Sequence, residues 1–311
     1  MFNNDLQQKI LAIILRRKVG LSLTASNRLL HEANGRALSS EKEILEFVKP
    51  HVKADYEFSE RNVASAVEAL QKHEMLGIEV VPITSARYPK ALYQSPNPPA
   101  ALFVRGHIDV LDELPGVAVV GSRDISANGA EITRRITEQL VEQGYVIVSG
   151  LALGVDAAAH RASLQSKGKT IAVLAGGVDN PTPKQNQRLA EEILDAGGLV
   201  LSEYPVGNKP FRDQFVERNR IQVGLSCGSV IIEAALKSGT MTQADFCTKA
   251  KRPLFAVVPH LPANPLKLHC EGTQELVSRG QAIPLRTKKD YDELSARLLE
   301  FREQFKSIPL I

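Results

Sequence analysis

The sequence predicts an α/β protein: an extended Rossmann-like, doubly wound and mainly parallel sheet, preceded by a small helical N-terminal domain. The sheet is predicted by six short apolar runs after residue 116, most of which end in Gly or Pro. Helical stretches separate most of these runs, and such alternation is typical of a parallel sheet covered on both faces. The helical domain is predicted by apolar residues that recur three or four positions apart near the N-terminus.

The helical pattern runs from residue 5 to about residue 75 and is clearest in LQQKILAIILRRKVGLSLTASNRLL and EKEILEFVKPHV. The stretch SSEKE at 39–43 offers an N-cap, because a serine hydroxyl can accept a hydrogen bond from the first turn of a helix. We therefore expect a helical domain over residues 1–80. The periodicity suits a packing module as well as a module with an activity of its own.

A proline-rich connector follows at 83–106, with prolines at positions 89, 96, 98 and 99. Prolines at this density predict extended or turn structure and exclude a helix. The connector leads into a short predicted strand, ALFVRG. We expect the Rossmann-like domain, including this connector, over residues 81–285, and a tail over 286–311 that forms one amphipathic helix.

The apolar runs are the predicted strands between about residue 116 and residue 260: GVAVVGS, YVIVSG, TIAVLAGG, LVLSEYP, SVIIEAA and PLFAVVP. After the first run, Ile132, Ile136 and Leu140 lie four apart and therefore share one face of a helix. After the third run, KQNQRLAEEILDAGG ends in glycines, which suit the C-terminus of a helix.

Composition limits the function classes. Of the 311 residues, 43% are hydrophobic and 23% are charged, so a folded core is expected rather than disorder. The net charge of +3 is mild, so a nucleic-acid role has to depend on a local basic patch. No apolar run reaches the ~18 residues of a membrane span. Three cysteines without C-x-x-C spacing indicate neither a disulfide framework nor a zinc site, and we expect a cytoplasmic protein without a metal or cofactor.

Glycines and polar residues follow the predicted strands at their carboxyl ends, where doubly wound sheets bind ligands. Glycines there let a ligand approach the backbone, and helix N-termini offer free N–H donors to an anion. The pattern therefore predicts a phosphate-binding rim. Its candidate residues are Gly121, Ser122 and Arg123; Gly150, Gly154 and Asp156; Gly176, Gly177 and Asp179; Glu203; and Glu233, Ser238, Gly239 and Thr240.

The rim lacks the common nucleotide motifs. There is no G-x-G-x-x-G after the first strand and no G-x-x-x-x-G-K-[ST], which argues against an ordinary NAD site and a P-loop ATPase. Asp156 and His160 lie four apart on a predicted helix and could form a base and its orienting partner. With no nucleophile nearby, the structural alternative is favoured: Asp156 accepts backbone N–H groups and His160 bonds to Asp156. We expect no catalytic residues.

The stretch GNKPFRDQFVERNRIQVGLSCG, residues 207–228, places basic residues among aromatic ones. Such a mixture suits single-stranded nucleic acid, because the charges follow phosphates while the rings stack on bases. A solvated loop with two core phenylalanines is the alternative. The residues concerned are Lys209, Phe211, Arg212, Phe215, Arg218 and Arg220.

From about Ile83 to Ala282, these residues together resemble the DprA/Smf family of bacterial DNA-processing proteins. VAVVGSR resembles the family's first strand and G-S-R turn. SGLALGVDAAAH matches its S-G-x-A-x-G-x-D-x-x-A-H motif at every defined position. YPKALYQSPNPPAALFVRG resembles the segment that precedes these motifs, and TIAVLAGGVD, LSEYP, RNRI with GLS, and FAVVP follow in family order.

The resemblance implies a Rossmann-like domain that binds single-stranded DNA, forms a homodimer and helps to load a RecA-type recombinase, without an established catalytic reaction. By motif it assigns DNA contacts to Arg123, Phe215, Arg218 and Arg220. Lys209 and Arg212 are predicted contacts from charge and position alone. Pocket shape is assigned to Gly150 and Gly154. Pocket support is assigned to Asp156 and His160, and is also expected from Gly176, Gly177, Asp179, Glu203, Asn219 and Glu233.

The chain departs from the family pattern at several positions. Val216 stands where the family often has Pro, Gln243 replaces a usual Thr, and AGG replaces a usual GCG in the third strand. The tail leaves no room for the winged-helix domain that many members carry. We therefore expect a divergent member without that domain.

Two other functions stay open. The same Rossmann variant resembles the lysine-decarboxylase-like phosphoribohydrolases, so the chain could process or sense nucleotides. Their signature G-G-x-G-T-x-x-E has a faint counterpart in KSGTMTQADF, but its glutamate is absent and Gln243 is the nearest polar group. Alternatively, DNA binding could serve to regulate an operon-encoded partner, for example in phage defence, rather than DNA recombination or uptake.

Overall fold

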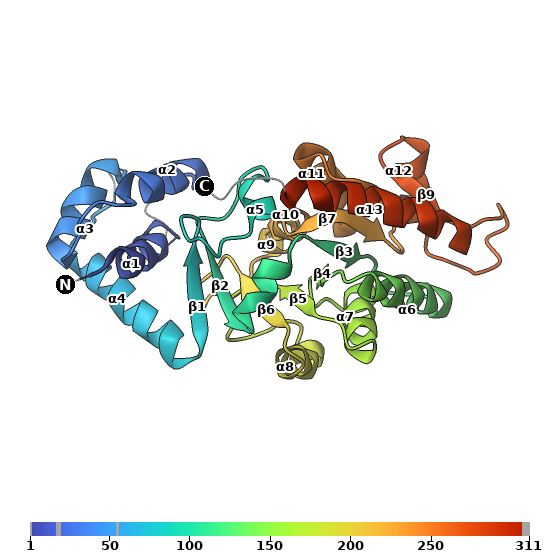
Figure 1. Ribbon diagram of the computed structural model, residues 1–311, viewed down its shortest axis with the longest axis horizontal. Helices are drawn as coiled ribbons and strands as arrows, with labels where there is room; N and C mark the ends of the chain where they lie inside the picture. Colours follow the sequence, from blue (N-terminus) through green and yellow to red (C-terminus); the bar gives the residue numbers. More distant parts are fainter. Residues whose placement is uncertain (1, 17–19, 54–55, 307–311) are drawn as a thin grey trace.

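The computed structural model describes residues 2–16, 20–53 and 56–306, and in this part of the chain nine strands form one sheet (Figure 1). The sheet order is β1-β2-β6-β5-β4-β3-β7-β8-β9. The seven strands from β6 to β9 are parallel, whereas β2 runs antiparallel to both β1 and β6. The strands are β1 (Ile78–Pro82), β2 (Ala101–Gly106), β3 (Gly116–Val120), β4 (Ile147–Ser149), β5 (Thr170–Val173), β6 (Leu199–Ser202), β7 (Ser226–Ile231), β8 (Leu254–Val257) and β9 (Ile283–Leu285).

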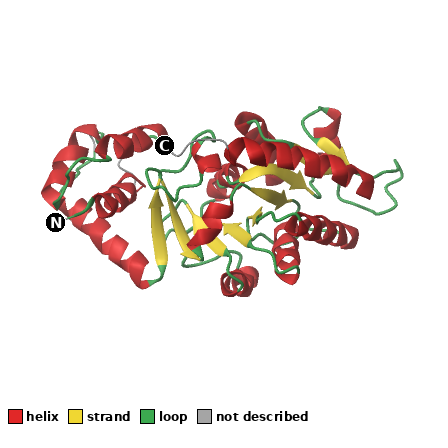
Figure 2. Ribbon diagram, in the orientation of Figure 1, coloured by secondary structure: helices red, strands yellow, loops and turns green. Residues whose placement is uncertain are grey.

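Helices cover both faces of the sheet, as the near-continuous apolar strands predict (Figure 2). On one face, Val117 and Val119 of β3 pack with α6 and α7, and on the other face Val120 packs with α10, α11 and α12. The predicted α/β class and doubly wound sheet are confirmed. The helices after β3 are α6 (Ala127–Glu142), α7 (Val155–Gln165), α8 (Gln187–Asp195), α9 (Arg212–Glu217), α10 (Asn219–Gly224), α11 (Thr242–Ala250), α12 (Glu271–Ser278) and α13 (Tyr291–Lys306).

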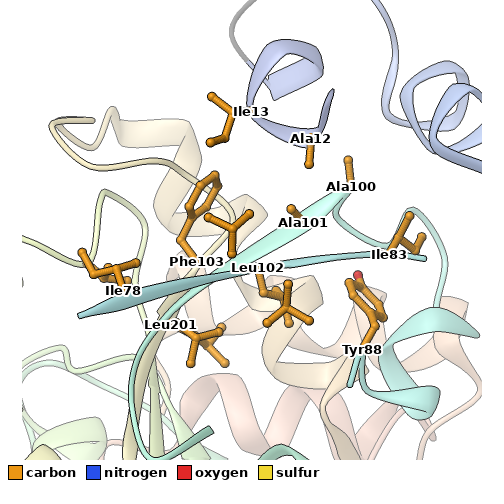
Figure 3. Close-up of a cluster of buried hydrophobic side chains, with 14 of the residues drawn as sticks. Ala12, Ile13, Ile78, Ile83, Tyr88, Ala100, Ala101, Leu102, Phe103 and Leu201 are labelled. Carbon is orange, nitrogen blue, oxygen red and sulfur yellow. The ribbon is translucent and has the colours of Figure 1, made fainter. Parts of the chain in front are cut away.

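Four helices precede the sheet and lie at one end of the molecule: α1 (Asn4–Arg16), α2 (Leu23–Ala33), α3 (Glu41–Val48) and α4 (Glu60–Met75). Within SSEKE the N-cap is Ser40, whose hydroxyl accepts a hydrogen bond from the Glu43 amide at 3.3 Å. Ile13 of α1 lies over Phe103 of β2, and Ala12 lies over Ala100 and Ala101 (Figure 3), so these helices share a core with the sheet. The boundary expected at residue 80 falls inside β1, and the division into domains stays a prediction.

The prediction that the prolines exclude a helix from 83–106 is wrong for one turn, α5 (Lys90–Tyr93). Pro89 occupies the N-cap of α5, where a missing backbone N–H removes no intrahelical hydrogen bond. The predicted strand ALFVRG is β2. Strands β1 and β9 were not predicted: β1 is an edge strand that ends in Pro82, and β9 has only three residues.

Short 3-10 turns complete the elements at Lys49–His51, Ile108–Glu113, Lys184–Asn186, Gly239–Met241 and Lys288–Asp290. The tail helix α13 returns to the sheet: a Cβ on Gly228 of β7 would meet the Leu298 side chain at 2.5 Å. Among the described residues, no helix has the length and apolar character that crossing a bilayer requires. The same residues contain no group of three or more His, Cys, Asp or Glu side chains placed to hold a metal ion.

Candidate functional site

A pocket of about 680 Å³ opens at the carboxyl ends of β3 and β7. These strands are neighbours in the sheet, yet the chain leaves β3 toward β4 on one side and reaches β8 from β7 on the other. Such a switch point leaves a crevice between the flanking loops, and ligands of doubly wound sheets bind there. The predicted residues that line it are Gly121, Ser122, Arg123, Asp156, Arg212, Phe215, Arg218, Asn219, Ser238, Gly239 and Thr240.

Arg218, between α9 and α10, places a buried cation in the pocket wall. Its side chain is 7% exposed and its Nη2 lies 3.6 Å from Oδ2 of Asp156. That oxygen also accepts hydrogen bonds from the backbone amides of Gly150 (3.1 Å) and Ala152 (3.4 Å). Burial lowers the pKa of the Arg218 guanidinium, because its charge is poorly solvated.

Gly150 makes room for this arginine. A Cβ on Gly150 would overlap Nη1, Cζ and Nη2 of Arg218. Gly150 has no positive φ, so the requirement for glycine here is one of space rather than of backbone conformation. The first glycine of VSGLALGVDAAAH therefore allows the guanidinium to lie against the backbone that follows β4.

A cation–aromatic pair stands at the side of the pocket. The Arg123 guanidinium carbon, after β3, lies 5.7 Å from the ring centroid of Phe215 on α9. Arg123 is exposed and Phe215 is half-buried. Arg212 of α9 is exposed and also lines the pocket. Three arginines and two aspartates line the pocket, so these residues carry net positive charge, with one ring available for stacking.

The turn after β7 forms a further part of the pocket wall. The Thr240 hydroxyl donates to the Gly121 carbonyl at 3.1 Å, and Nδ2 of the Asn219 side chain donates to the Gly239 carbonyl at 3.4 Å. Two buried polar atoms in this wall, Ser238 Oγ and Gln243 Oε1, have no hydrogen-bond partner among the described residues. The wall therefore contains two buried polar groups whose hydrogen-bonding capacity the described residues leave unmet.

A family model described as DNA recombination-mediator protein A matches residues 79–295. The chain belongs to this family. Protein Smf of Synechocystis sp. is 37% identical over 254 residues, which are 80% of this chain and 63% of the relative, so the chain spans less than two thirds of that relative's length. The predicted resemblance to the DprA/Smf family is thus confirmed.

Solved structures of the recombination-mediator family share the fold. DNA processing protein A from Streptococcus pneumoniae superposes with a TM-score of 0.71 at 31% identity, covering 91% of this chain and 96% of that chain. A structure of the Helicobacter pylori protein, described as giving insights into its single-stranded DNA binding mode, superposes with a TM-score of 0.60 at 33% identity. That alignment covers 68% of this chain and 93% of the other.

Other predicted residues of this family member lie behind the pocket. Gly154 has a φ of +75°, and a Cβ there would overlap the Ser122 carbonyl, so it lets the loops after β3 and β4 approach. The buried Glu233 carboxylate accepts hydrogen bonds from the Ser126 amide (2.9 Å), the Ser126 hydroxyl (2.6 Å) and the His269 amide (3.0 Å). Both residues therefore shape the loop that carries Arg123.

The glycines after β5 support a different loop. Asp179 accepts a hydrogen bond from the Gly207 amide at 3.1 Å, and Gly177 donates to the Asn208 carbonyl at 2.9 Å. A Cβ on Gly176 would lie 2.8 Å from Pro210 Cδ. This close packing holds the loop between β6 and α9, which carries the exposed Lys209. Neither Lys209 nor these supports line the pocket itself.

Two predicted roles are at odds with the geometry. Arg220 lies outside the pocket: it is buried, and its Nη2 pairs with Oε2 of Glu203 at 2.7 Å. His160 does not bond to Asp156; its Nδ1 lies 2.7 Å from Oγ1 of Thr170, which donates to the Ile147 carbonyl. Helical spacing alone predicts a bond between His160 and Asp156, but the fold places the hydroxyl of Thr170, on β5, within hydrogen-bond distance of His160.

The pocket is also lined by seven residues that were not predicted as site residues: Val120, Asp124, Ala152, Val216, Gln222, Ala235 and Gln243. The side-chain amide of Gln222 fits its neighbours in one orientation: its oxygen accepts a hydrogen bond from Arg218 Nη1, and its nitrogen donates one to Asn219 Oδ1 at 3.1 Å. Phe211, the N-cap of α9, is 68% exposed. This residue is one of the two aromatics predicted in the basic stretch; its ring is exposed beside Arg212, and it does not line the pocket.

His160 gives a pH-dependent contribution to stability that can be measured. Burial lowers its pKa to about 3, so the folded chain holds a neutral imidazole whose unfolded pKa is about 6.5. As the pH falls from 6.5 toward 3, the His160 imidazole binds a proton in the unfolded chain but stays neutral in the folded chain. The free energy of unfolding should then fall by about 1.4 kcal/mol per pH unit from this group.

Denaturant unfolding of wild type and His160→Gln at several pH values tests this expectation. Gln can keep a hydrogen bond to Thr170 but cannot titrate. Between about pH 6 and pH 4, the free energy of unfolding of the variant should change with pH less steeply than that of wild type, by the contribution of one proton. Equal slopes in the two proteins would show that His160 does not carry the effect.

Proposed function

We propose that the chain is a non-enzymatic single-stranded-DNA-binding protein that acts as a recombination mediator. The observation that carries this proposal is the juxtaposition in one pocket of the buried Arg218 and the Arg123–Phe215 pair. Arginines bind phosphates bidentately, and an aromatic ring stacks on a base that is not paired in a duplex. The Helicobacter pylori relative, whose structure is described by its single-stranded DNA binding mode, supports the same ligand.

The arrangement favours binding over chemistry. Asp156 is 4% exposed and its Oδ2 already accepts two backbone amides beside Arg218, so this oxygen is poorly placed to take a proton from a substrate. Family membership further suggests a homodimer and contact with a RecA-type recombinase, and we include both in the proposal. A derived role through an operon-encoded partner, as in phage defence, is compatible with the same DNA site.

Salt-titrated binding of labelled oligothymidylate, compared with a duplex, tests the proposal. We expect the single strand to bind more tightly and log affinity to fall with log salt by about 0.7 for each phosphate contacted. Arg123→Ala should reduce that slope by about 0.7, because one cation is lost. Phe215→Ala should weaken binding about tenfold at an unchanged slope, because a stacked ring carries no charge.

The control is Arg188→Ala. Arg188 is an exposed arginine of α8 outside the pocket, and its side chain is 92% exposed. This variant has the same charge change as Arg123→Ala and should leave both the affinity and the slope unaltered. If the wild-type protein binds no single strand at low salt, the proposed function is wrong.

A nucleotide-processing function is the second candidate, because Ser238 Oγ and Gln243 Oε1 are unpaired in the pocket wall. A nucleoside monophosphate could satisfy such atoms. Gln243, however, supplies no carboxylate for acid–base chemistry. Incubation with nucleoside monophosphates separates the two functions, since release of free base would favour hydrolysis and its absence would favour binding.

A further inference from the structure

The loop between β6 and α9, residues 203–211, leads directly into the pocket residues Arg212, Phe215 and Arg218. Its first residue, Glu203, is 1% exposed, and its carboxylate forms ion pairs with two arginines. Arg220 of α10 pairs with its Oε2 at 2.7 Å, and Arg16 at the end of α1 approaches the same oxygen at 3.0 Å. One carboxylate therefore joins the helical N-terminal segment, the start of the loop and the helix that follows Arg218.

Arg16 makes further contacts with the same segment. Its Nε donates to the Glu203 carbonyl at 3.0 Å, and its guanidinium carbon lies 4.3 Å from the ring centroid of Tyr204. Its side chain is only 19% exposed, so these contacts are largely shielded from water. A guanidinium that binds a carboxylate, a carbonyl and a ring at once fixes the position of that backbone more firmly than a surface ion pair does.

A second side chain of the helical segment holds the loop three residues later. The Val206 amide donates to Nε2 of His73, on α4, at 3.1 Å. Nδ1 of His73 lies 2.5 Å from the Ala69 carbonyl, and the ring lies 5.0 Å from the Phe103 ring. Because the Ala69 carbonyl can only accept, the proton lies on Nδ1, and Nε2 is the acceptor of the Val206 hydrogen bond.

We propose that Arg16 and His73 are positioning residues, through which helices α1 and α4 hold the β6–α9 loop and thereby set the geometry of the single-strand site. The loop is held from two sides: the helical segment fixes residues 203–206, and Asp179 and Gly177 fix residues 207–208. The pocket contacts of Arg212 and Phe215 then depend on helices distant in the sequence. This inference rests on the proposed function.

Arg16→Met tests the role of the clamp formed by Arg16, Glu203 and His73. Glu203 keeps Arg220 in this variant, so no buried carboxylate is left unpaired and the chain is expected to stay folded. Oligothymidylate affinity should fall about tenfold. The salt slope should also fall, by about 0.7 for each phosphate contact that the displaced loop loses. Amide exchange over residues 205–217 should quicken in the absence of DNA.

His73 offers a matched pair. His73→Gln keeps an acceptor for the Val206 amide and should bind nearly as wild type does. His73→Leu removes the acceptor and should reproduce the losses of Arg16→Met. Arg28→Met is the control, because Arg28 forms an exposed ion pair with Glu32 on α2, away from the loop.

The outcomes separate positioning from stability. If Arg16→Met and His73→Leu bind with wild-type affinity, slope and exchange, the clamp has no role. If they only reduce the active fraction in a stoichiometric titration, with slope and affinity of that fraction unchanged, the residues support folding alone and the proposal is overturned. Failure of the wild type to bind DNA would instead overturn the proposed function, while the exchange experiment would still test the clamp.

Discussion

Replacing Arg218 by Met is expected to weaken single-stranded DNA binding about 100-fold while the chain remains folded. The loss is large because a bidentate, charge-assisted contact to a phosphate contributes about 3 kcal/mol. The fold should tolerate the change for two reasons. Burial lowers the pKa of Arg218, so its charge is held at a cost, and Asp156 keeps its two backbone amides at the N-terminus of α7.

The measurement combines binding with thermal unfolding. Arg218→Lys is the matched variant, because it keeps a charge but lacks the planar fork, and it should recover only part of the affinity. The melting temperature of Arg218→Met should lie below that of wild type, because the buried Asp156 carboxylate loses its cation, but the variant should still be fully folded at the temperature of the binding assay. A folded variant that binds with wild-type affinity would place the phosphate contacts elsewhere, on the exposed Arg123 and Arg212.

The sheet was predictable because its strands are buried on both faces. The apolar parts of GVAVVGS and SVIIEAA, GVAVV and VII, identify interior strands; the first is β3 and the second overlaps the end of β7 at the switch point. Residues that follow such strands must gather at one edge, so most of the pocket followed from chain order alone. The edge strand β1, IEVVP, contains an exposed glutamate and ends in a proline, so its local pattern does not reveal a strand.

Side-chain partners were less predictable than positions. Arg218 and Arg220 belong to the same R-N-R stretch and have the same charge, yet one enters the pocket and the other pairs with Glu203. Arg218 precedes α10 and Arg220 lies in its first turn, so the two side chains point in different directions, and only the position of β6 decides which arginine meets the carboxylate. His160 likewise contacts Thr170 of β5, and helical spacing cannot predict a partner that lies on a strand.

The helical segment shows why one-dimensional patterns miss its connection to the site. Its periodicity reports one buried face per helix and therefore predicts packing. Arg16 and His73 lie far from Glu203 and Val206 in the chain, and their contacts exist only because α1 and α4 pack beside β1 and β2. A basic residue at the end of a helix would ordinarily be assigned to solvent.

Gly150→Ala is expected to remove most of the single-strand affinity by acting through Arg218. The added methyl would overlap the guanidinium, which must leave its place against the backbone, so binding should fall by up to about 100-fold, as in Arg218→Met. Stability should fall by about 1–3 kcal/mol, because the buried site is overpacked. The φ of Gly150 is not positive, so backbone strain adds nothing to this loss.

The double variant Gly150→Ala/Arg218→Met separates steric displacement from other effects of the methyl group. Met ends where the guanidinium begins, so the atoms that the new Cβ would meet are absent. The double variant should therefore bind no more weakly than Arg218→Met alone, and its stability should match that of Arg218→Met. The coupling energy between the two sites should then nearly equal the loss that Gly150→Ala causes in the wild-type background. Losses that multiply in the double variant would mean that Gly150 contacts DNA through its own backbone, and the role of Arg218 in the pocket wall would then have to be reassigned.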